Sequence, residues 1–363
     1  MKQIKIVYDN IIFSIQKAGG ISKYWAELIK RHKKKNIVFF ELKNQNIFRN
    51  SLSIPILKES KIPLLILRYL PFLKKIEPGS IFHSSYYRTT FQKDIINITT
   101  VHDFTYNYFA KGIKKLIHCY QKSASIKNSD GIICISNNTK KDLLKFFPFA
   151  KKKKIKVIYN GVDNSFFKIK NLKRNIPIDL QHLIEKKLIV YVGDREGVYK
   201  NFFLVLDIIN SLNDYYLLCI GGGDIKKKER KYINKKIKNK FYHIDKIDTH
   251  KLNIIYNISF CLLYPSSYEG FGIPVIEAMK AGCPVISTKK SSIPEISGNA
   301  AILINEINKK QFIQSVKLLE NRNIRNKYIK RGFRQANKFS WDRCFNETLK
   351  FYLEVHKNKI KVK

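Results

Sequence analysis

The chain has 363 residues, of which 44% are apolar, and it carries a formal net charge of +41. This length and apolar content suffice for two globular domains, each with a sizeable buried core. A bilayer-spanning helix is excluded, because the most apolar segment, residues 62–73, is short and is interrupted by proline and arginine. The six cysteines are scattered without a CxxC pair, which indicates reduced core residues of a cytosolic protein and excludes a disulfide framework.

The charge leaves three interpretations open. Lysine far outnumbers arginine and runs through the whole chain, which is typical of compositional bias with solvated side chains. The same charge would suit a basic surface that faces an anionic membrane, or a nucleic-acid partner. A nucleic-acid partner is the least favoured, because no known nucleic-acid-binding motif is present and the aromatic residues are spread through the predicted core elements.

Taken in chain order, the first half alternates strand-like apolar runs with helical patterns. Residues 2–8 indicate a first strand and not a signal peptide, because they lack a long uninterrupted apolar core. Residues 62–73 are expected to form a buried helix, with an amphipathic segment in a membrane interface as the alternative. The strands expected in this half are 4–8, 37–42, 81–83, 98–102, 131–136 and 156–159.

The alternation restarts after a charged stretch. It predicts two doubly wound domains with parallel sheets, joined within residues 160–187 and facing a cleft. A serine-capped helix is expected from Ser340, and residues 357–363 are expected to form a frayed basic tail. The strands expected in the second half are 188–193, 216–221, 241–243, 260–264 and 284–288.

Ligands of open α/β sheets bind at the carboxyl ends of the strands. Two loops at such strand ends in the first domain hold candidate ligand-binding residues. Gly19 and Gly20 open a helix that runs to about Arg31, and their bare amides suit a phosphate or an acceptor; a simple loop-to-helix turn is the alternative. His102 ends a strand and can exchange a hydrogen bond with a sugar hydroxyl, with Asp103 capping or orienting it; a buried structural histidine is the alternative.

A third loop, between the strand 188–193 and a helix near Asn201, holds two cations five residues apart. Arg195 can grip a diphosphate leaving group bidentately, and Lys200 can add a point charge that replaces a divalent metal. The alternative is a surface ion pair in which Glu196 neutralises either cation.

A fourth loop holds two glutamates eight positions apart, Glu269 and Glu277, around the turn Gly270-Phe271-Gly272-Ile273. The amides of Phe271, Gly272 and Ile273 open a helix and are expected to point at an anion, while Glu277 can accept hydrogen bonds from a diol. A sugar nucleotide carries both groups. Solvated helix-face charges are the alternative interpretation.

Two other chemistries are disfavoured. Paired carboxylates also serve glycoside hydrolysis, but a hydrolase of neutral sugars would not need the anion site between these glutamates. A metal cluster of His243, Asp245, Asp248 and His250 is poorly supported, because these residues lie at a strand-to-loop transition with a lysine among them.

The segment from Glu269 to Ile286 resembles the donor-site signature of the family-4 retaining glycosyltransferases of GT-B fold. The resemblance covers nearly the whole chain. The motifs that follow the family's order are Tyr8-Asp9-Asn10, Gly19-Gly20-Ile21-Ser22-Lys23-Tyr24, His102-Asp103, residues 133–140, residues 157–163, Val192-Gly193-Asp194-Arg195 with Lys200-Asn201, Ser292-Ile293-Pro294-Glu295 and the segment after Trp341.

This resemblance implies an α/β fold of two Rossmann-like domains. Residues 1–165 would form the acceptor-side domain, joined by a C-terminal helix at about 341–357 that crosses back to it, and residues 186–340 the donor domain. Arg195 and Lys200 would then stabilise the departing nucleoside diphosphate, Glu277 would hold the ribose hydroxyls, and Glu269 would contact the transferred sugar. Gly19 and Gly20 would approach the diphosphate or the acceptor, and His102 would touch the sugar. One departure is the first loop, which is stretched by residues 11–18.

The resemblance implies a retaining glycosyltransferase that needs no metal and no cofactor. Its motif variants resemble bacterial surface-polysaccharide mannosyltransferases, so GDP-mannose is the first expectation for the donor, with a UDP-sugar as the alternative. The acceptor would be a lipid-linked glycan or polysaccharide, and the enzyme would be cytoplasmic, peripheral on the inner face of the plasma membrane, without a nucleic-acid partner. The rival functions are a nucleotide-sugar epimerase or phosphorylase of the same fold, and a basic nucleic-acid-binding protein.

Overall fold

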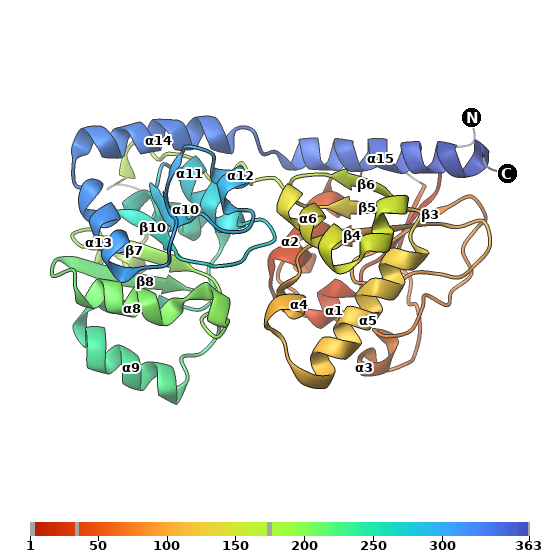
Figure 1. Cartoon of the computed structure of the whole chain (residues 1–363), viewed down its shortest axis with the longest axis horizontal. Helices are drawn as coiled ribbons and strands as arrows, with labels where there is room; N and C mark the ends of the chain where they lie inside the picture. The colour runs from red at the N-terminus through yellow and green to blue at the C-terminus, as the bar shows by residue number, and fades with distance from the viewer. Residues whose placement is uncertain (1–3, 33–35, 173–175, 362–363) are drawn as a thin grey trace. The chain divides into compact units, whose positions relative to one another are not determined.

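The computed structural model describes residues 4–32, 36–172 and 176–361. The chain divides into two compact units, one of Met1–Gly161 with Trp341–Lys363, the other of Val162–Ser340. Each unit holds a six-stranded sheet in which every paired strand is parallel to its neighbour, with helices on its faces (Figure 1). The predicted α/β fold with two doubly wound sheets is therefore confirmed. Residues 2 and 3 of the expected first strand lie outside the described residues.

The sheet of the first unit has the order β2-β1-β3-β4-β5-β6. Its strands are short apolar runs, and β3 to β5 are buried throughout because helices cover a parallel sheet on both faces. The strands are β1 (Ile6–Asp9), β2 (Ile37–Phe40), β3 (Ile81–Ser84), β4 (Ile96–Val101), β5 (Gly131–Cys134) and β6 (Lys154–Val157). The helices are α1 (Ile12–Ile15), α2 (Gly20–Lys30), α3 (Leu64–Leu67), α4 (Thr105–Phe109), α5 (Gly112–Asn128), α6 (Asn137–Phe146) and α15 (Trp341–Lys361), with short 3-10 turns at Arg49–Ser51 and Pro148–Lys152.

The last helix, α15, completes the core of the first unit. Trp341, Phe351 and Tyr352 are buried in the same apolar cluster as Tyr8 of β1, and the Tyr8 and Tyr352 hydroxyls lie 3.2 Å apart. The helix continues to Lys361, and Lys359 Nζ donates to Asp130 Oδ2 at 2.8 Å. The expectation of a frayed tail from residue 357 is therefore wrong as far as residue 361, because this ion pair holds the last turns; residues 362 and 363 lie outside the described residues.

The sheet of the second unit has the order β12-β11-β10-β7-β8-β9. Its strands are β7 (Lys187–Val192), β8 (Tyr215–Ile220), β9 (Phe241–Ile244), β10 (Cys261–Tyr264), β11 (Val285–Thr288) and β12 (Ala301–Ile304), the last of which the sequence analysis missed. The helices are α7 (Ile178–Gln181), α8 (Phe202–Asn210), α9 (Lys227–Ile237), α10 (Thr249–Ile258), α11 (Ile273–Ala281), α12 (Ile293–Ser297), α13 (Lys309–Leu318) and α14 (Arg322–Ala336), with 3-10 turns η4 (Val198–Lys200) and η5 (Lys238–Lys240).

The segment 62–73 is not the buried helix that was expected. Only α3 is helical there, because Pro63 precedes it and the chain turns away after Arg68. Leu65, Ile66 and Leu73 are exposed. Among the described residues, no helix combines the length and the apolar character that crossing a membrane requires.

A buried ion-pair network ties β1 to the loops around it. Arg88 is fully buried, and its guanidinium lies 2.9 Å from Asp9 Oδ2 at the end of β1 and 2.5 Å from Glu59 Oε1. Its Nε donates to the Leu70 carbonyl at 2.9 Å. One cation therefore balances two buried carboxylates.

We expect Arg88→Met to lower the free energy of unfolding by about 3–5 kcal/mol, because it leaves two buried carboxylates without their counter-charge. The control is Arg343→Met, which breaks the exposed pair with Glu347 on α15; it should cost at most about 0.5 kcal/mol. Urea denaturation followed by circular dichroism measures both. Equal effects of the two substitutions would contradict the role of the Arg88 network.

Four buried or half-buried histidines of the first unit make its stability depend on pH. Burial lowers the pKa of His32, His102 and His118 from 6.5 to about 4, and it lowers the pKa of His83 well below 6.5. Between pH 4 and 6.5 the unfolded chain therefore binds more protons than the folded chain. The neutral histidines favour the folded state fully above pH 6.5, and this advantage is lost as the pH falls from 6.5 toward 4.

We expect the free energy of unfolding to fall as the pH is lowered from 6.5 to 4. The slope of this fall should be smaller for His32→Gln than for the wild type, because this substitution removes one of the four groups. Urea melts at a series of pH values give both slopes. A slope that His32→Gln leaves unchanged would exclude His32 as a contributor.

Candidate functional site

The strand order of the second unit predicts where a ligand would bind. The chain starts this sheet at β7, builds outward through β8 and β9, and then returns to add β10, β11 and β12 on the other side. The order therefore reverses between the neighbours β7 and β10. In open α/β sheets the loops at such a reversal diverge and leave a crevice at the carboxyl ends of the strands. The loops after β7 and β10 carry Lys200 and Glu269.

The structure brings Lys200 and Glu269 together. Lys200 Nζ lies 2.6 Å from Glu269 Oε1 and 3.4 Å from the Tyr264 hydroxyl, and about nine tenths of each charged side chain is buried. Burial disfavours the charge on Lys200, but the Glu269 carboxylate more than offsets it and raises the pKa of this lysine. Lys200 therefore stays a fixed cation, and Glu269 rather than Glu196 is its partner. Glu196 instead pairs with Lys226.

Two hydrogen bonds to backbone carbonyls connect the loops and fix this pair. The Ser267 N–H donates to the Tyr199 carbonyl at 2.8 Å, and Asn201 Nδ2 donates to the Pro265 carbonyl at 2.8 Å. Asn201 is in the left-handed region, with φ of 54°, where asparagine is better tolerated than most residues. It ends η4 and starts α8, so it aims the preceding Lys200 at the loop after β10.

Two serines that the sequence analysis gave no role hold the glutamate loop in place. The Ser291 hydroxyl donates to the Glu269 carbonyl at 2.5 Å and lies 3.1 Å from its N–H, while the Ser292 hydroxyl is 3.0 Å from the carbonyls of both Glu269 and Phe271. Their partners are backbone atoms 21 to 23 residues away, which no local pattern reveals. The only signal was the Ser-Ile-Pro-Glu motif that begins at Ser292.

The turn 270–273 opens α11 as expected. Gly272 is the residue before the helix and has φ of 96°, a conformation that side chains rarely adopt, and a Cβ there would lie 2.8 Å from Ile293 Cδ1. Phe271 is buried, with its ring edge-on to Phe339 at 5.7 Å. Pro274 has no N–H, and the Val275 N–H donates to the Gly272 carbonyl at 3.0 Å, so of the first three helical residues only Ile273 has an N–H that can point at an anion. Phe271 therefore anchors the turn, and the anion contacts predicted for Gly270, Phe271 and Gly272 stay predictions.

Glu277 lies one turn into α11 and is 4% exposed. Its Oε2 accepts from the Tyr256 hydroxyl of α10 at 3.4 Å. Burial and then the neighbouring carboxylate raise the pKa of Tyr256 well above its ordinary value, so this hydroxyl keeps its proton and remains a donor.

Arg195 has partners other than the Lys200–Glu269 pair. Its buried guanidinium donates to the carbonyls of Gly221, Gly223 (2.7 Å) and Asp224 (3.1 Å), and its Nε lies 3.3 Å from Glu229 Oε1. It therefore braces the glycine loop after β8. The predicted contact with a diphosphate stays a prediction, and it requires these acceptors to be exchanged for phosphate oxygens.

In the first unit, the structure places His102 against the helix that Gly19 and Gly20 open. The His102 ring lies edge-on to Tyr24 of α2 at 5.0 Å, and its buried Nε2 has no hydrogen-bond partner among the described residues. Asp103 accepts from the Thr105 N–H at 2.9 Å, so it caps the next turn and does not orient the histidine. A Cβ on Gly19 would lie 2.7 Å from Gln16 Oε1. The stretched loop before it contains α1, whose Ile12 and Phe13 are buried.

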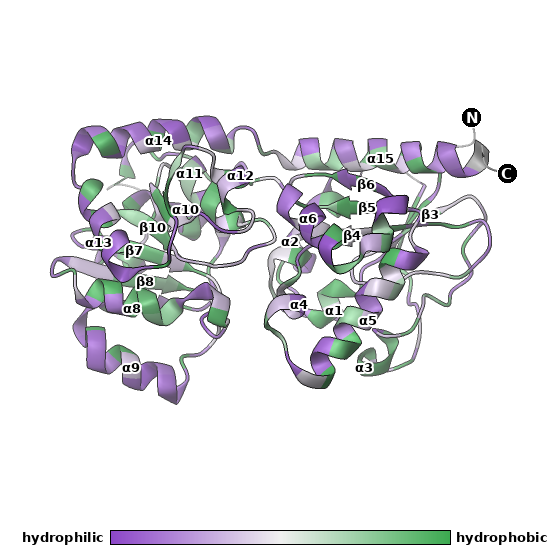
Figure 2. Cartoon of the chain, in the orientation of Figure 1, coloured by the Kyte–Doolittle hydropathy of each residue, from purple (hydrophilic) through white to green (hydrophobic). Residues whose placement is uncertain are grey.

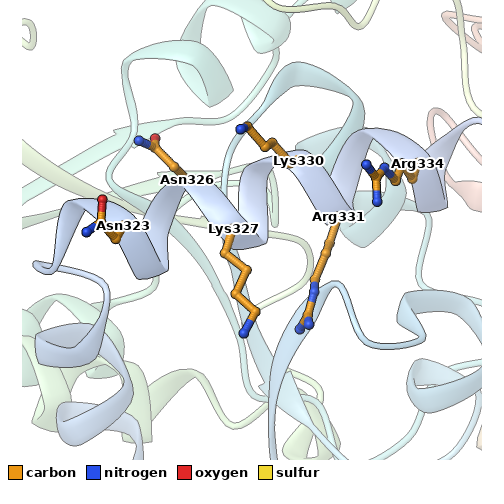
Figure 3. Close-up of a pocket in the computed structure, with 6 residues that line it drawn as sticks. All are labelled: Asn323, Asn326, Lys327, Lys330, Arg331 and Arg334. Atoms are coloured by element: carbon orange, nitrogen blue, oxygen red, sulfur yellow. The ribbon is translucent and has the colours of Figure 1, made fainter.

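The described part of the chain holds no cluster of three metal-ligating side chains. His243 instead lies 3.0 Å from the Arg195 guanidinium, and Asp248 caps α10 by accepting from the Lys251 N–H. A separate hollow runs along α14, where Figure 3 shows Lys327 and Arg331 pointing one way and Lys330 the other. Because these side chains diverge along a single helix, they form a solvated basic face, and none of the predicted site residues lies there.

Two family models match the chain. The model described as glycosyl transferases group 1 matches residues 173–335, and glycosyltransferase family 4 matches residues 18–166. Among curated relatives, the O-antigen chain mannosyltransferase RfbU of Salmonella typhimurium is 27% identical over 61% of this chain and 60% of that protein. The O-antigen chain mannosyltransferase B of Escherichia coli is 35% identical over 28% of this chain and 27% of that protein. The chain thus spans less than two thirds of both relatives.

Solved structures show the same fold at low identity. Sucrose-phosphate synthase from Thermosynechococcus elongatus has a TM-score of 0.75 at 16% identity, covering 98% of this chain and all of that chain. Anabaena HepE in complex with UDP-glucose has a TM-score of 0.77 at 11% identity, covering 97% of this chain and all of that chain. From the two family matches and the paired parallel sheets, the chain belongs to family 4 of the glycosyltransferases of GT-B fold.

Proposed function

We propose that the protein transfers a hexose from a nucleoside-diphosphate sugar to a lipid-linked or polysaccharide acceptor in cell-surface glycan synthesis. The transfer retains the anomeric configuration and requires no metal. The observation that carries this proposal is the buried Lys200–Glu269 pair, held by two loops at the strand-order reversal, with Glu277 eight residues after Glu269.

The diphosphate of the donor would bind between Lys200 and the start of α11. Lys200 has three donors and uses only part of them on Glu269 and Tyr264, so it can also donate to a phosphate oxygen. The helix N-terminus adds the Ile273 N–H and the positive end of its dipole. These groups supply the charge that a divalent cation supplies in other transferases.

The nucleoside would be recognised through its ribose. Glu277 is buried beside Tyr256, and the two oxygens of a carboxylate suit the two hydroxyls of a ribose diol, because both are acceptors. Such hydrogen bonds to a charged acceptor are stronger than those between neutral groups. Glu269, held rigid by Lys200 and Ser291, would contact the transferred sugar.

In the chemical step, the bond between the anomeric carbon and the leaving phosphate oxygen breaks, and the acceptor oxygen bonds to that carbon on the same face. The proton of the acceptor hydroxyl passes to the leaving phosphate oxygen. Negative charge grows on the diphosphate as the bond breaks, so fixed cations that bind it more tightly in the transition state lower the barrier. Lys200 fits this role as it stands, and Arg195 would join it after leaving the glycine loop.

For the donor we propose GDP-mannose, with a UDP-sugar as the second candidate. The first rests on the mannosyltransferase names of RfbU and its Escherichia coli relative, and the second on the UDP-glucose complex of HepE. In the first unit, His102 remains the proposed contact to the sugar, because its unpartnered Nε2 can exchange a hydrogen bond with a hydroxyl. Gly19 and Gly20 remain the proposed contacts to the diphosphate or acceptor.

We expect Lys200→Met and Glu269→Gln each to lower the transfer rate by roughly 10²–10³-fold, because each removes a group aligned with the developing charge or the transferred sugar. Transfer of radiolabelled sugar from donor to acceptor measures the rate. Lys251→Met is the matched control, since it breaks an exposed pair with Asp179 in the same unit. Circular dichroism confirms that each variant is folded, and a wild-type rate in either site variant would refute the assignment.

We also expect nucleoside diphosphates to raise the melting temperature by binding the native state, with GDP giving the largest shift in a panel of bases. Glu277→Ala should remove the shift for every base, because the ribose is common to all of them. A larger shift with UDP would replace GDP-mannose by a UDP-sugar. No shift with any nucleoside diphosphate would refute the donor class.

A further inference from the structure

Helix α5 of the first unit carries an apolar face that points to solvent. Ile113, Leu116, Ile117 and Tyr120 follow the i, i+3, i+4, i+7 spacing of one helical face. Their exposed fractions are 68%, 66%, 42% and 78%. On a helix of a globular protein this face would normally pack on the core, but here the buried residues of α5 begin only at Gln121.

A second exposed apolar segment lies at α3 and just after it. Leu65 is 78% exposed, and Ile66, Tyr69 and Leu73 are each about half exposed or more. This is the segment that the sequence analysis expected to be buried. Four large apolar side chains in nine residues therefore face water in a part of the chain that is fully described.

Contacts between the two segments make them one surface. Gln121 of α5 donates to the Arg68 carbonyl, and the Arg68 guanidinium donates to the Tyr86 hydroxyl at 3.2 Å. His118 of α5 packs edge-on to Tyr86 at 6.2 Å. Figure 2 colours α3 as hydrophobic and places it beside the α5 helix, on which hydrophobic and hydrophilic residues alternate. We name the exposed residues of these two segments the α3–α5 surface.

The charged side chains within these two segments are all positive. Residues 60–76 and 104–129 contain no aspartate and no glutamate. The acids that flank these stretches in the sequence have other partners: Glu59 is buried against Arg88, Glu77 pairs with Lys5, Asp103 accepts from the Thr105 N–H, and Asp130 pairs with Lys359. The lysines on and beside the apolar residues are Lys61, Lys74, Lys75, Lys111, Lys114 and Lys115.

We propose that the α3–α5 surface docks the protein on an anionic lipid bilayer. Leucine and isoleucine would enter the boundary between headgroups and acyl chains, tyrosines would lie at headgroup level, and the lysines would face the lipid phosphates. Charge complementarity favours this occupant, because an apolar face without a single acid in either segment suits an anionic surface. A contiguous exposed apolar face of this kind marks an interaction site in a soluble protein.

This proposal goes beyond the proposed function, because it assigns a second site that takes no part in the chemistry. It explains why an enzyme acting on lipid-linked acceptors would keep large apolar side chains in water. Vesicle binding is measured without donor or acceptor, so the docking test and the transfer assay fail independently.

The test compares two substitutions that change the charge equally. Leu116→Glu lies in the α3–α5 surface, and Ile178→Glu replaces an isoleucine that is 86% exposed on α7 of the second unit. Flotation of the full chain with vesicles of phosphatidylcholine and phosphatidylglycerol should show binding weakened about tenfold or more by Leu116→Glu, since this exposed leucine would no longer be transferred from water into the bilayer. Ile178→Glu should leave binding unchanged. Equal loss in both variants, or none in either, would overturn the proposal.

The charge requirement is tested by lysine substitution and lipid composition. Lys114→Gln should weaken binding to the same vesicles about fivefold, the contribution of one basic residue near an anionic surface. Vesicles of phosphatidylcholine alone should bind the wild type much more weakly. Binding that is equal for neutral and anionic vesicles would overturn the lysine contribution and with it the proposal.

A fluorescent reporter separates a membrane from a protein partner. Both native tryptophans, Trp25 and Trp341, are buried, so Tyr120→Trp adds an exposed reporter. Its emission should shift to the blue with anionic vesicles, whereas that of Ile178→Trp should not. Analytical ultracentrifugation checks the other occupant: if Leu116→Glu dissolves a dimer and leaves vesicle binding intact, the surface joins two copies of the chain and the proposal is wrong.

Discussion

All strands of both sheets are parallel, and this constraint determines where the helices and the ligand-binding loops lie. A parallel strand must be followed by a crossover, so each sheet is covered on its faces and open only at its edges and strand ends. The carboxyl ends of the strands then share one edge, and the loops diverge where the strand order reverses. In the second unit this reversal lies between β7 and β10, whose loops supply Lys200 and Glu269. The proposed site therefore lies at strand ends that no helix covers.

Much of the fold could be predicted because buried strands are apolar runs bounded by polar residues. The missed strand β12 is only Ala301–Ile304, and a run of four apolar residues cannot be told from the turn of a buried helix by periodicity. The segment 62–73 misled for a related reason: its apolar residues predicted burial, but Pro63 and the chain beyond Arg68 limit the helix to one turn, too short to cover the sheet. Composition indicates a hydrophobic segment without saying what covers it.

The candidate site, like the fold, could be predicted from the sequence only in part. Residue types and their spacing pointed to Lys200, Glu269 and Glu277, because the chemistry of a sugar nucleotide demands a cation, an anion site and a diol acceptor. The supports of these residues could not be predicted. Ser291 bonds to the backbone of Glu269 across 22 residues, and Arg195 is enclosed by carbonyls of a glycine loop. Contacts of this kind depend on three-dimensional packing and on which backbone groups remain unpaired, neither of which leaves a local pattern.

The return of α15 to the first unit affects the order in which the protein can form. Tyr8 and Tyr352 touch although 344 residues separate them, and the cluster around them also contains Trp341 and Phe351. A ribosome therefore releases the whole second unit before the first unit receives its last core side chains. The second unit has all its strands in one continuous stretch and can fold independently of the first unit. The first unit is complete only when the final helix packs on it. This packing joins residues far apart in the sequence, so we expect it to be a late step in the folding of the chain.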